Sequence, residues 1–302
     1  MTDLQTPPAQ ERSYSQGQLV RMRFFRHKGA IVAMVVLAVV VLVAFTSIGI
    51  GPIPGWWDKA PEAPYEKIGT GAPSWEHPFG QDTIGKDYFA LVMLGTQKSL
   101  IIAFGVGLIS TLIGTLIGAV AGYFRGWLES VLMRLTDLLL VIPLLVLAAV
   151  LGKMASGWGI WGLTVVLGVV LWTSLARLVR GEMLSLRERD FVVAATAVGT
   201  GSGRIIFKHI LPNAIGTIIV SATLTISSAI LLETSLSYLG YGVQAPDTSL
   251  GLLISDYQTA FTTRPWLFWW PGLMILTIAL TVNFIGDGLR DAFDPRQNRT
   301  KA

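Results

Sequence analysis

The sequence contains no cysteine and only three histidines, and charged residues are scarce. Without cysteine the chain forms no disulfide bond, Cys-ligated zinc site or iron–sulfur cluster. Charged residues make up 14% of the chain and hydrophobic residues 52%, whereas soluble domains average about 25% charged residues. Because long apolar runs take up much of the sequence, lipid rather than water is the expected environment for most of it.

Sequence signatures of catalysis and of metal or nucleic-acid binding are also missing. His27, His77 and His209 are too far apart in the sequence to suggest a metal site. Residues 80–86 spell GxxxxGK, the first part of a nucleotide-binding P-loop, but Asp87 stands where the loop needs Ser or Thr to hold magnesium. The net charge of +4 does not indicate nucleic-acid binding, because the basic residues lie at the ends of apolar runs. We therefore predict that the chain is not an enzyme and holds no cofactor of its own.

The apolar runs predict an all-α polytopic membrane protein with six transmembrane helices. A hydrocarbon core of about 30 Å requires roughly 20 helical residues. The predicted spans cover residues 29–50, 99–122, 130–152, 158–179, 213–239 and 266–287. The first run follows a basic cluster, as in a signal peptide, but about 20 apolar residues exceed the usual apolar region of such a peptide. We therefore interpret it as an uncleaved first span.

The positions of the basic residues predict the orientation of these spans. With both termini in the cytoplasm, most of the 23 Lys and Arg residues fall in cytoplasmic segments, in agreement with the positive-inside rule. Tryptophans cluster at the predicted outer ends of two spans, where they serve either as interface anchors or as packing residues. These residues are Trp158, Trp161, Trp266, Trp269 and Trp270.

One predicted span carries a row of glycines at helical spacing. Gly114, Gly118 and Gly122 recur every four residues on one face of the second span. Such faces allow two helix backbones to approach closely in lipid. The row therefore predicts a helix-packing face, although the sequence does not identify the partner helix.

Two acidic residues lie within predicted spans, where a charge costs about 2.5–3.5 kcal/mol on insertion scales. Asp137 either pairs with Arg134, one turn away, or lies in a transport path, and we favour the local pair. Glu233 has no oppositely charged neighbour within one turn, so we expect it to face a polar cavity or another subunit. Asp137 and Glu233 are thus the candidates for a translocation path.

The segment between the fourth and fifth spans is the most informative part of the chain. Asp190 can cap a short helix that extends through Val198, and Gly199 suits a left-handed stop. Ser202 can cap a second short helix that ends before Pro212. The segment therefore predicts two short helices that form a compact bracket at the membrane surface.

The composition of this bracket suits a docking role. Small and apolar side chains occupy residues 191–195, and the basic residues around them are Arg187, Arg189, Arg204 and Lys208. A small apolar knob with a charged rim fits a groove on a partner protein. The alternative is a solvated connector with an interfacial helix.

The spacing within this segment resembles the EAA loop of bacterial ABC importer permeases. That pattern runs Glu-Ala-Ala, then Gly, then an ending in Leu-Pro, and the separations match residues 193–195, Gly199 and residues 209–212. Val193 replaces the leading Glu, a departure at the position whose acid could form a salt bridge. The resemblance assigns an ATPase-coupling loop to residues 187–212. Its expected coupling residues are Asp190, Val193, Ala194, Ala195, Gly199, Arg204, His209 and Pro212.

Other segments resemble the C-type permeases of dipeptide and oligopeptide importers. These segments are residues 77–87, 97–100, 236–244, 283–291 and 294–296. The resemblance implies a permease in the bacterial inner membrane that pairs with a homologous second permease and two cytoplasmic ATPase subunits. ATP and magnesium would be bound by the ATPases, and an extracytoplasmic substrate-binding protein would deliver the substrate.

The same resemblance divides the chain into parts. We expect a cytoplasmic tail at residues 1–28, the first transmembrane helix at 29–50, an extracytoplasmic segment at 51–97, a permease core at 98–290 and a second cytoplasmic tail at 291–302. Dipeptides or oligopeptides are the expected substrates, with nickel chelates and glutathione as alternatives. Two other hypotheses are an ion-driven carrier that works alone and a scaffold without transport. Ion-driven carriers tend to have clustered midplane charges, and here only Asp137 and Glu233 are available.

Overall fold

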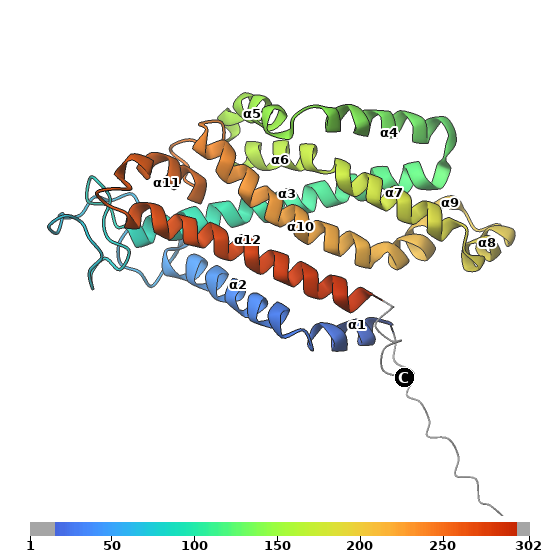
Figure 1. Ribbon diagram of the computed structural model, residues 1–302, viewed down its shortest axis with the longest axis horizontal. Helices are drawn as coiled ribbons and strands as arrows, with labels where there is room; N and C mark the ends of the chain where they lie inside the picture. Colours follow the sequence, from blue (N-terminus) through green and yellow to red (C-terminus); the bar gives the residue numbers. More distant parts are fainter. Residues whose placement is uncertain (1–15, 295–302) are drawn as a thin grey trace, which may run out of the picture.

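The computed structural model describes residues 16–294, and its helices run mainly along one long axis (Figure 1). The first part contains α1 (Gln16–Phe24), α2 (Lys28–Ser47), β1 (Gly49–Ile50), β2 (Ile53–Pro54), α3 (Tyr88–Phe124), α4 (Gly126–Val141) and α5 (Leu144–Met154). The next part contains η1 (Ser156–Trp158), α6 (Gly159–Leu171), α7 (Thr173–Arg187), α8 (Asp190–Ala197), α9 (Ser202–Arg204) and η2 (Ile205–Ile210). The last part contains α10 (Leu211–Tyr238), α11 (Leu250–Tyr257), η3 (Gln258–Ala260) and α12 (Trp266–Phe293).

The number of candidate spans agrees with the sequence. Within residues 16–294, four helices are long and apolar enough to cross a membrane, namely α2, α3, α12 and the continuous helix Ser202–Tyr238, and two bent helix pairs bring the number up to six. The prediction of an all-α polytopic membrane protein is therefore confirmed. The predicted spans at residues 130–152 and 158–179 each correspond to a bent pair of helices.

Both breaks lie within apolar sequence. The α4–α5 pair is bent by 93° at Ile142 and Pro143, where the proline has no N–H to donate and keeps the preceding residue extended. The α6–α7 pair is bent by 41° around Trp172, which retains right-handed helical dihedrals. The first bend is therefore a sharp proline break and the second a milder change of direction.

Several predicted boundaries shift in the structure. Helix α3 begins at Tyr88, ahead of the predicted core at residue 98, because the Asp87 side chain caps it by accepting from the Ala90 N–H at 2.8 Å. Its 37 residues extend about 55 Å, well beyond a 30 Å hydrocarbon core. Helix α1 lies inside the predicted N-terminal tail, and α12 continues to Phe293. The remaining tail residues, 1–15 and 295–302, lie outside the described residues.

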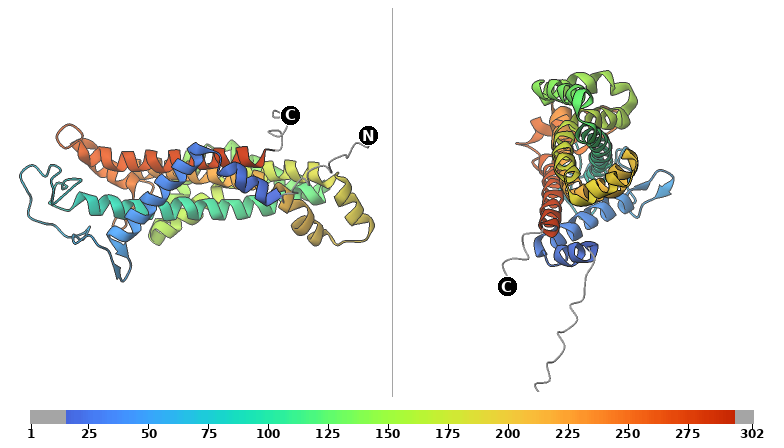
Figure 2. Two further views of the ribbon diagram at one scale, coloured as in Figure 1. Left: turned by 90° about the horizontal axis from the view of Figure 1, so that it is seen from below. Right: turned by 90° about the vertical axis from the view of Figure 1, so that its right-hand side faces the viewer.

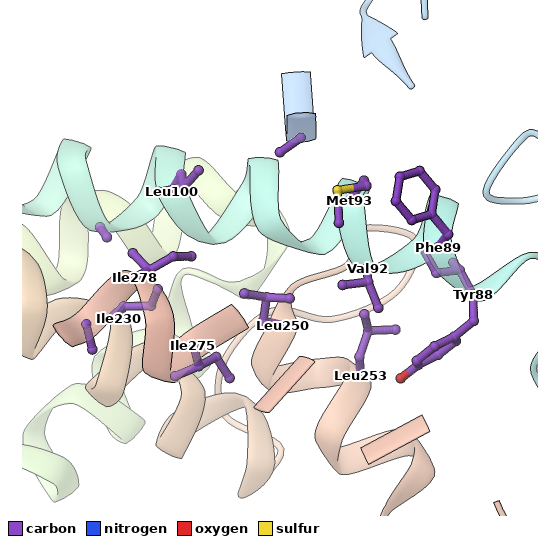
Figure 3. Packing of buried hydrophobic residues seen from close by; sticks show 14 of the residues in the cluster. Tyr88, Phe89, Val92, Met93, Leu100, Ile230, Leu250, Leu253, Ile275 and Ile278 are labelled. Atoms are coloured by element: carbon purple, nitrogen blue, oxygen red, sulfur yellow. The ribbon is translucent and has the colours of Figure 1, made fainter. Parts of the chain in front are cut away.

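The largest buried cluster joins α3, α10, α11 and α12. Figure 3 shows Tyr88 and Val92 of α3 beside Leu253 of α11. The Tyr88 hydroxyl also donates to the Leu267 carbonyl of α12. Full burial of each large apolar side chain contributes about 1.5–3 kcal/mol, so this cluster holds the short helix α11 against the main bundle.

The glycine row forms a close helix–helix contact, as predicted, and the structure identifies α7 as the partner. A Cβ built at Gly114 would lie 2.8 Å from the Trp172 carbonyl oxygen, and one at Gly118 would lie 2.5 Å from that of Ala176. At Gly122 the nearest atom would be the Cβ of Met183, at 2.6 Å. Only glycine permits this approach, so the row locks α7 to α3.

The non-helical segment between β2 and α3 is tied to the bundle by polar contacts. His77 Nδ1 lies 2.6 Å from the Asp87 carboxylate, and both side chains are buried. The Tyr257 hydroxyl donates to Asp82 at 3.0 Å. Burial and the nearby Asp82 charge raise the pKa of Tyr257, so this hydroxyl keeps its proton and acts as a donor.

The tryptophans predicted at the outer ends of spans fall into two groups. Trp158, Trp161 and Trp269 are exposed. Trp270 instead stacks on Phe79 with ring centroids 3.9 Å apart. For Trp270 the structure therefore favours the packing alternative.

Candidate functional site

Helix α8 protrudes at the end of the molecule opposite α11 (Figure 1). It follows α7 after a two-residue connection, Glu188 and Arg189. Arg189 is the N-cap with extended dihedrals, and Asp190 is the first residue of the helix. The predicted cap at Asp190 is thus wrong by one position, although a carboxylate in the first turn still interacts favourably with the helix dipole.

The predicted stop at Gly199 is confirmed. Its φ is +80°, and its N–H donates to the Thr196 carbonyl at 3.0 Å. The next residue, Thr200, donates to the Ala195 carbonyl at 3.1 Å. These bonds satisfy carbonyls at the end of α8 and turn the chain sharply, which glycine permits without strain.

The second short helix differs from the prediction. Gly201, rather than Ser202, is the N-cap of α9, and the helix does not end before Pro212 but continues through η2 into α10. Segment η2 is a π-helix, and Pro212 lies in the first turn of α10. Proline is tolerated there because a first-turn N–H needs no helical partner. The bracket is therefore one short helix joined to the start of a long span.

One face of α8 is buried against this span. Val192 is 2% exposed and belongs to a cluster with Ile205, Ile206 and Met183. Arg187, at the end of α7, donates to the Tyr123 carbonyl of α3 at 2.5 Å. Packing and hydrogen bonding together fix the position of α8 relative to α3, α7 and α10.

The opposite face of α8 is apolar and exposed. Phe191, Ala194 and Val198 follow one another at helical spacing and are all exposed, Val198 to 82%. We call these three residues the α8 apolar stripe. Val193 is also exposed, at 57%, and Ala195 is half-buried. A fixed helix with an uncovered apolar stripe is suited to docking in a groove.

The remaining predicted coupling residues lie around this helix. Arg204 and Pro212 are exposed and His209 is half-buried. The His209 carbonyl accepts a hydrogen bond from the Asn213 side chain at 2.7 Å. Because Val193 is uncharged, this exposed position offers no acidic contact to a partner.

Asp137 pairs across helices rather than along its own. Its carboxylate lies 2.5 Å from the Arg177 guanidinium of α7, which corrects the predicted local pair with Arg134. A second pair joins Glu129 of α4 to Arg180 of α7. A cavity of about 550 Å³ opens between these helices. Its lining residues are Glu129, Ser130, Met133, Arg134, Asp137, Arg177 and Arg180.

Glu233 is fully buried within the chain, which corrects the prediction that it faces a polar cavity or another subunit. Its carboxyl accepts a hydrogen bond from the Ser237 hydroxyl at 2.7 Å and lies 3.4 Å from the Ser99 hydroxyl. Ser249 provides a third hydroxyl partner. Each of these serines also accepts a backbone N–H from residues 243–252, so Glu233 organises the connection between α10 and α11.

The two helix breaks face one another, a feature that sequence reasoning missed. A cavity of about 210 Å³ lies between them. It is lined by Leu139, Leu140, Val141, Ile142, Pro143, Leu144, Val170, Leu171, Thr173 and Ser174. Pro143 was the available signal for one break, since proline interrupts helical hydrogen bonding.

Comparisons with known proteins cover nearly all of the chain. Residues 114–299 match the family described as binding-protein-dependent transport system inner membrane component. Residues 15–58 match the N-terminal TM domain of oligopeptide transport permease C. The first match confirms the family predicted from the EAA-like spacing, and the second agrees with the resemblance to the C-type permeases of oligopeptide importers.

Individual relatives give the same picture. A putative peptide permease protein of Brucella ovis is 39% identical, with 93% of this chain and 92% of the relative covered. The oligopeptide transport system permease protein OppC of Mycobacterium bovis is 37% identical, covering 93% of this chain and 95% of the relative. The OppC protein of Bacillus subtilis is 33% identical, covering 95% of this chain and 92% of the relative.

A solved structure shares the fold. A chain of the MetNI methionine ABC transporter, in an inward-facing conformation, superimposes with a TM-score of 0.58 at 19% identity. The superposition covers 68% of this chain and 98% of that chain. The structural match shows the fold, while the family match over residues 114–299 and the relatives of up to 39% identity show that the chain belongs to the binding-protein-dependent transport system inner membrane components, the permeases of ABC importers.

Proposed function

We propose that this chain is the permease subunit of an ATP-driven importer of dipeptides or oligopeptides in a bacterial inner membrane. It forms half of the translocation path together with a homologous second permease. Two ATPase subunits in the cytoplasm bind ATP and magnesium, and an extracytoplasmic binding protein delivers the peptide. Both termini and α8 lie on the cytoplasmic side, in line with the distribution of basic residues.

The observation that carries this proposal is the geometry of α8. Its apolar stripe is uncovered among residues 16–294, while its other face is packed against the start of α10. A rigid attachment transmits force, because a flexible one would absorb the displacement. Movement of an ATPase docked on α8 would therefore pass to α7 and α10.

A charge placed on α8 tests the coupling role. In Ala195→Glu and Gly199→Glu we expect peptide uptake to be lost while the protein still inserts in the membrane. A charge at Ala195 would lie beside the apolar stripe, and a side chain at Gly199 would strain the turn that ends α8. The control is Ser185→Glu, which places the same charge at an exposed position on α7. Normal uptake and normal transport-coupled ATP hydrolysis in both α8 variants would contradict the proposal.

The peptide substrate is supported by the relatives, which are named as peptide and oligopeptide permeases. Uptake of labelled dipeptides and oligopeptides should be lost in a deletion strain and restored by the gene. Nickel chelates and glutathione are the competing substrates, and loss of their uptake alone would redirect the assignment. Uptake that survives ATP depletion but not collapse of the ion gradient would instead support an ion-driven carrier.

A further inference from the structure

A small β-hairpin after α2 carries large apolar side chains on its surface. Ile50 of β1 and Ile53 of β2 are direct partners in the antiparallel pair, so their side chains point to the same face. Ile50 is 53% exposed and Ile53 is 65% exposed, and Trp56 just beyond the hairpin is 61% exposed. We call these three residues the hairpin cluster.

This exposure belongs to a well-defined backbone rather than to a loose loop. The Gln97 amide of α3 donates to the carbonyls of Ala44, at 2.7 Å, and Gly49, at 2.9 Å. The Trp57 N–H donates to the Ser47 carbonyl at 2.8 Å. These bonds fasten the hairpin to the end of α2 and to an interior residue of α3, so the orientation of its apolar face is fixed.

The length of α2 places the hairpin at a membrane boundary. Its 20 residues extend about 30 Å, the thickness of the hydrocarbon core. The hairpin begins two residues after the last residue of α2, directly beyond a helix that is long and apolar enough to cross a membrane. The sequence carries no charge from Gly29 to Trp57, so its uncharged stretch continues past the end of the helix.

The direction of the hairpin favours lipid as its environment. Figure 2 shows the hairpin, in light blue, projecting sideways from the bundle rather than along its long axis. It also continues an exposed apolar row on α2. That row consists of Val32, Val35, Val39 and Leu42. An apolar surface that follows a membrane span and turns outward at its end can be covered by acyl chains along the helix and by the boundary with the headgroups at its end.

We propose that the hairpin cluster inserts into the boundary between acyl chains and headgroups at this end of α2 and so anchors the first span in the bilayer. The occupant of this surface is phospholipid. Trp56 suits this layer, because indole rings combine a large apolar surface with a polar N–H. Its N–H donates to the Thr46 hydroxyl at 3.2 Å, which keeps the ring beside the end of α2.

Because the chain contains no cysteine, an introduced cysteine is its single labelling site, and partner subunits freed of cysteine complete the complex. Ile53→Cys is labelled with an environment-sensitive fluorophore in the full transporter complex, reconstituted in phosphatidylethanolamine–phosphatidylglycerol vesicles. Trp75→Cys, at a fully exposed position of the same segment, is the matched control for water. Val39→Cys, in the middle of α2, is the reference for the bilayer interior, and Ile50→Cys is a second probe of the hairpin.

Nitroxide lipids and aqueous iodide then report the surroundings of each label. We expect a nitroxide near the headgroup to quench the Ile53 and Ile50 labels several-fold more than the Trp75 label, and a deep nitroxide to quench the Val39 label most. Iodide should quench the Trp75 label preferentially. Iodide quenching of the hairpin labels equal to that at Trp75 would overturn the proposal. Protection from both quenchers would also overturn it, because a protein subunit would then cover the hairpin.

Discussion

The carboxylate of Asp137 on α4 lies 2.5 Å from the guanidinium of Arg177 on α7, a residue 40 positions later in the sequence. Helix α4 has a single buried side chain, Thr136, so apolar packing alone holds it weakly. The ion pairs from α7 therefore contribute to its attachment. Since α7 leads directly to α8, they also link the proposed docking helix to the broken span α4–α5.

Charge reversal tests this link. We expect Asp137→Arg to reduce peptide uptake strongly and the double variant Asp137→Arg with Arg177→Asp to restore it. Coupling free energies between contacting residues are about 0.5–3 kcal/mol. Because both side chains are exposed, we expect a coupling free energy near the lower end of this range. Measuring uptake and thermal stability for the two single variants and the double variant gives the coupling directly.

The pair between Lys98 and Asp247 supplies the control for that cycle. Its reversal should change uptake little, because this pair involves neither α4 nor α7 and lies outside residues 187–212. If the double variant at 137 and 177 performed no better than Asp137→Arg alone, the pair would not hold α4 in the working transporter.

The buried Glu233 should be important for stability. Glu233→Ala removes the acceptor for the Ser237 hydroxyl and leaves a cavity, so we expect a loss of about 3 kcal/mol. Glu233→Gln keeps one acceptor oxygen, so its loss of unfolding free energy should be smaller than that of Glu233→Ala. The measurement is the unfolding temperature of the purified protein in detergent.

Glu182 offers a comparison for this measurement, since it accepts from the Thr217 hydroxyl at 3.0 Å but is only half-buried. Its replacement by alanine should lower the unfolding temperature less than Glu233→Ala does. Equal effects at the two positions would argue against a special role of the buried serine network.

The contact between α3 and α7 predicts opposite effects of alanine at two glycines. At Gly118 a new Cβ would lie 2.5 Å from a backbone carbonyl, so Gly118→Ala should destabilise the protein by about 1–3 kcal/mol. At Gly181 of α7 nothing lies within 4 Å of the new Cβ, and Gly181→Ala should stabilise by up to about 1 kcal/mol through helix propensity. Thermal unfolding of both variants checks the sign of each effect.

Asp256 on α11 predicts a pH effect. Partial desolvation by its neighbours raises the pKa of this carboxyl above its ordinary value of 3.8, and because the residue is largely exposed the effect on stability is small. A raised folded-state pKa contributes stability that is fully present below the unfolded pKa and is lost as pH rises through the folded value. Asp256→Asn cannot ionise, so it should be more stable than the parent at pH 7 and equal to it below about pH 4. Unfolding temperatures across this range test the sign, and a constant difference at all pH values would contradict it.

Features that depend on neighbouring residues along the chain were predictable from the sequence. The apolar runs gave the positions of the spans because crossing a bilayer requires roughly 20 consecutive apolar helical residues. The end of α8 was predictable because Gly199 adopts a left-handed conformation that other residues avoid. The EAA-like spacing then pointed to the family, since the separations between its motif residues are unusual enough to recognise.

Relationships between helices were decided by the tertiary structure. Sequence spacing offered Asp137 a partner one turn away, but packing of α4 beside α7 brought Arg177 closer. Likewise Glu233 had no visible partner along its own helix beyond the hydroxyl of Ser237, and burial became possible only where α3 supplied Ser99. Local periodicity determines whether a segment forms a helix and which residues share its face. Which face meets which neighbour depends on how all the helices pack together, and that information is distributed over the whole chain.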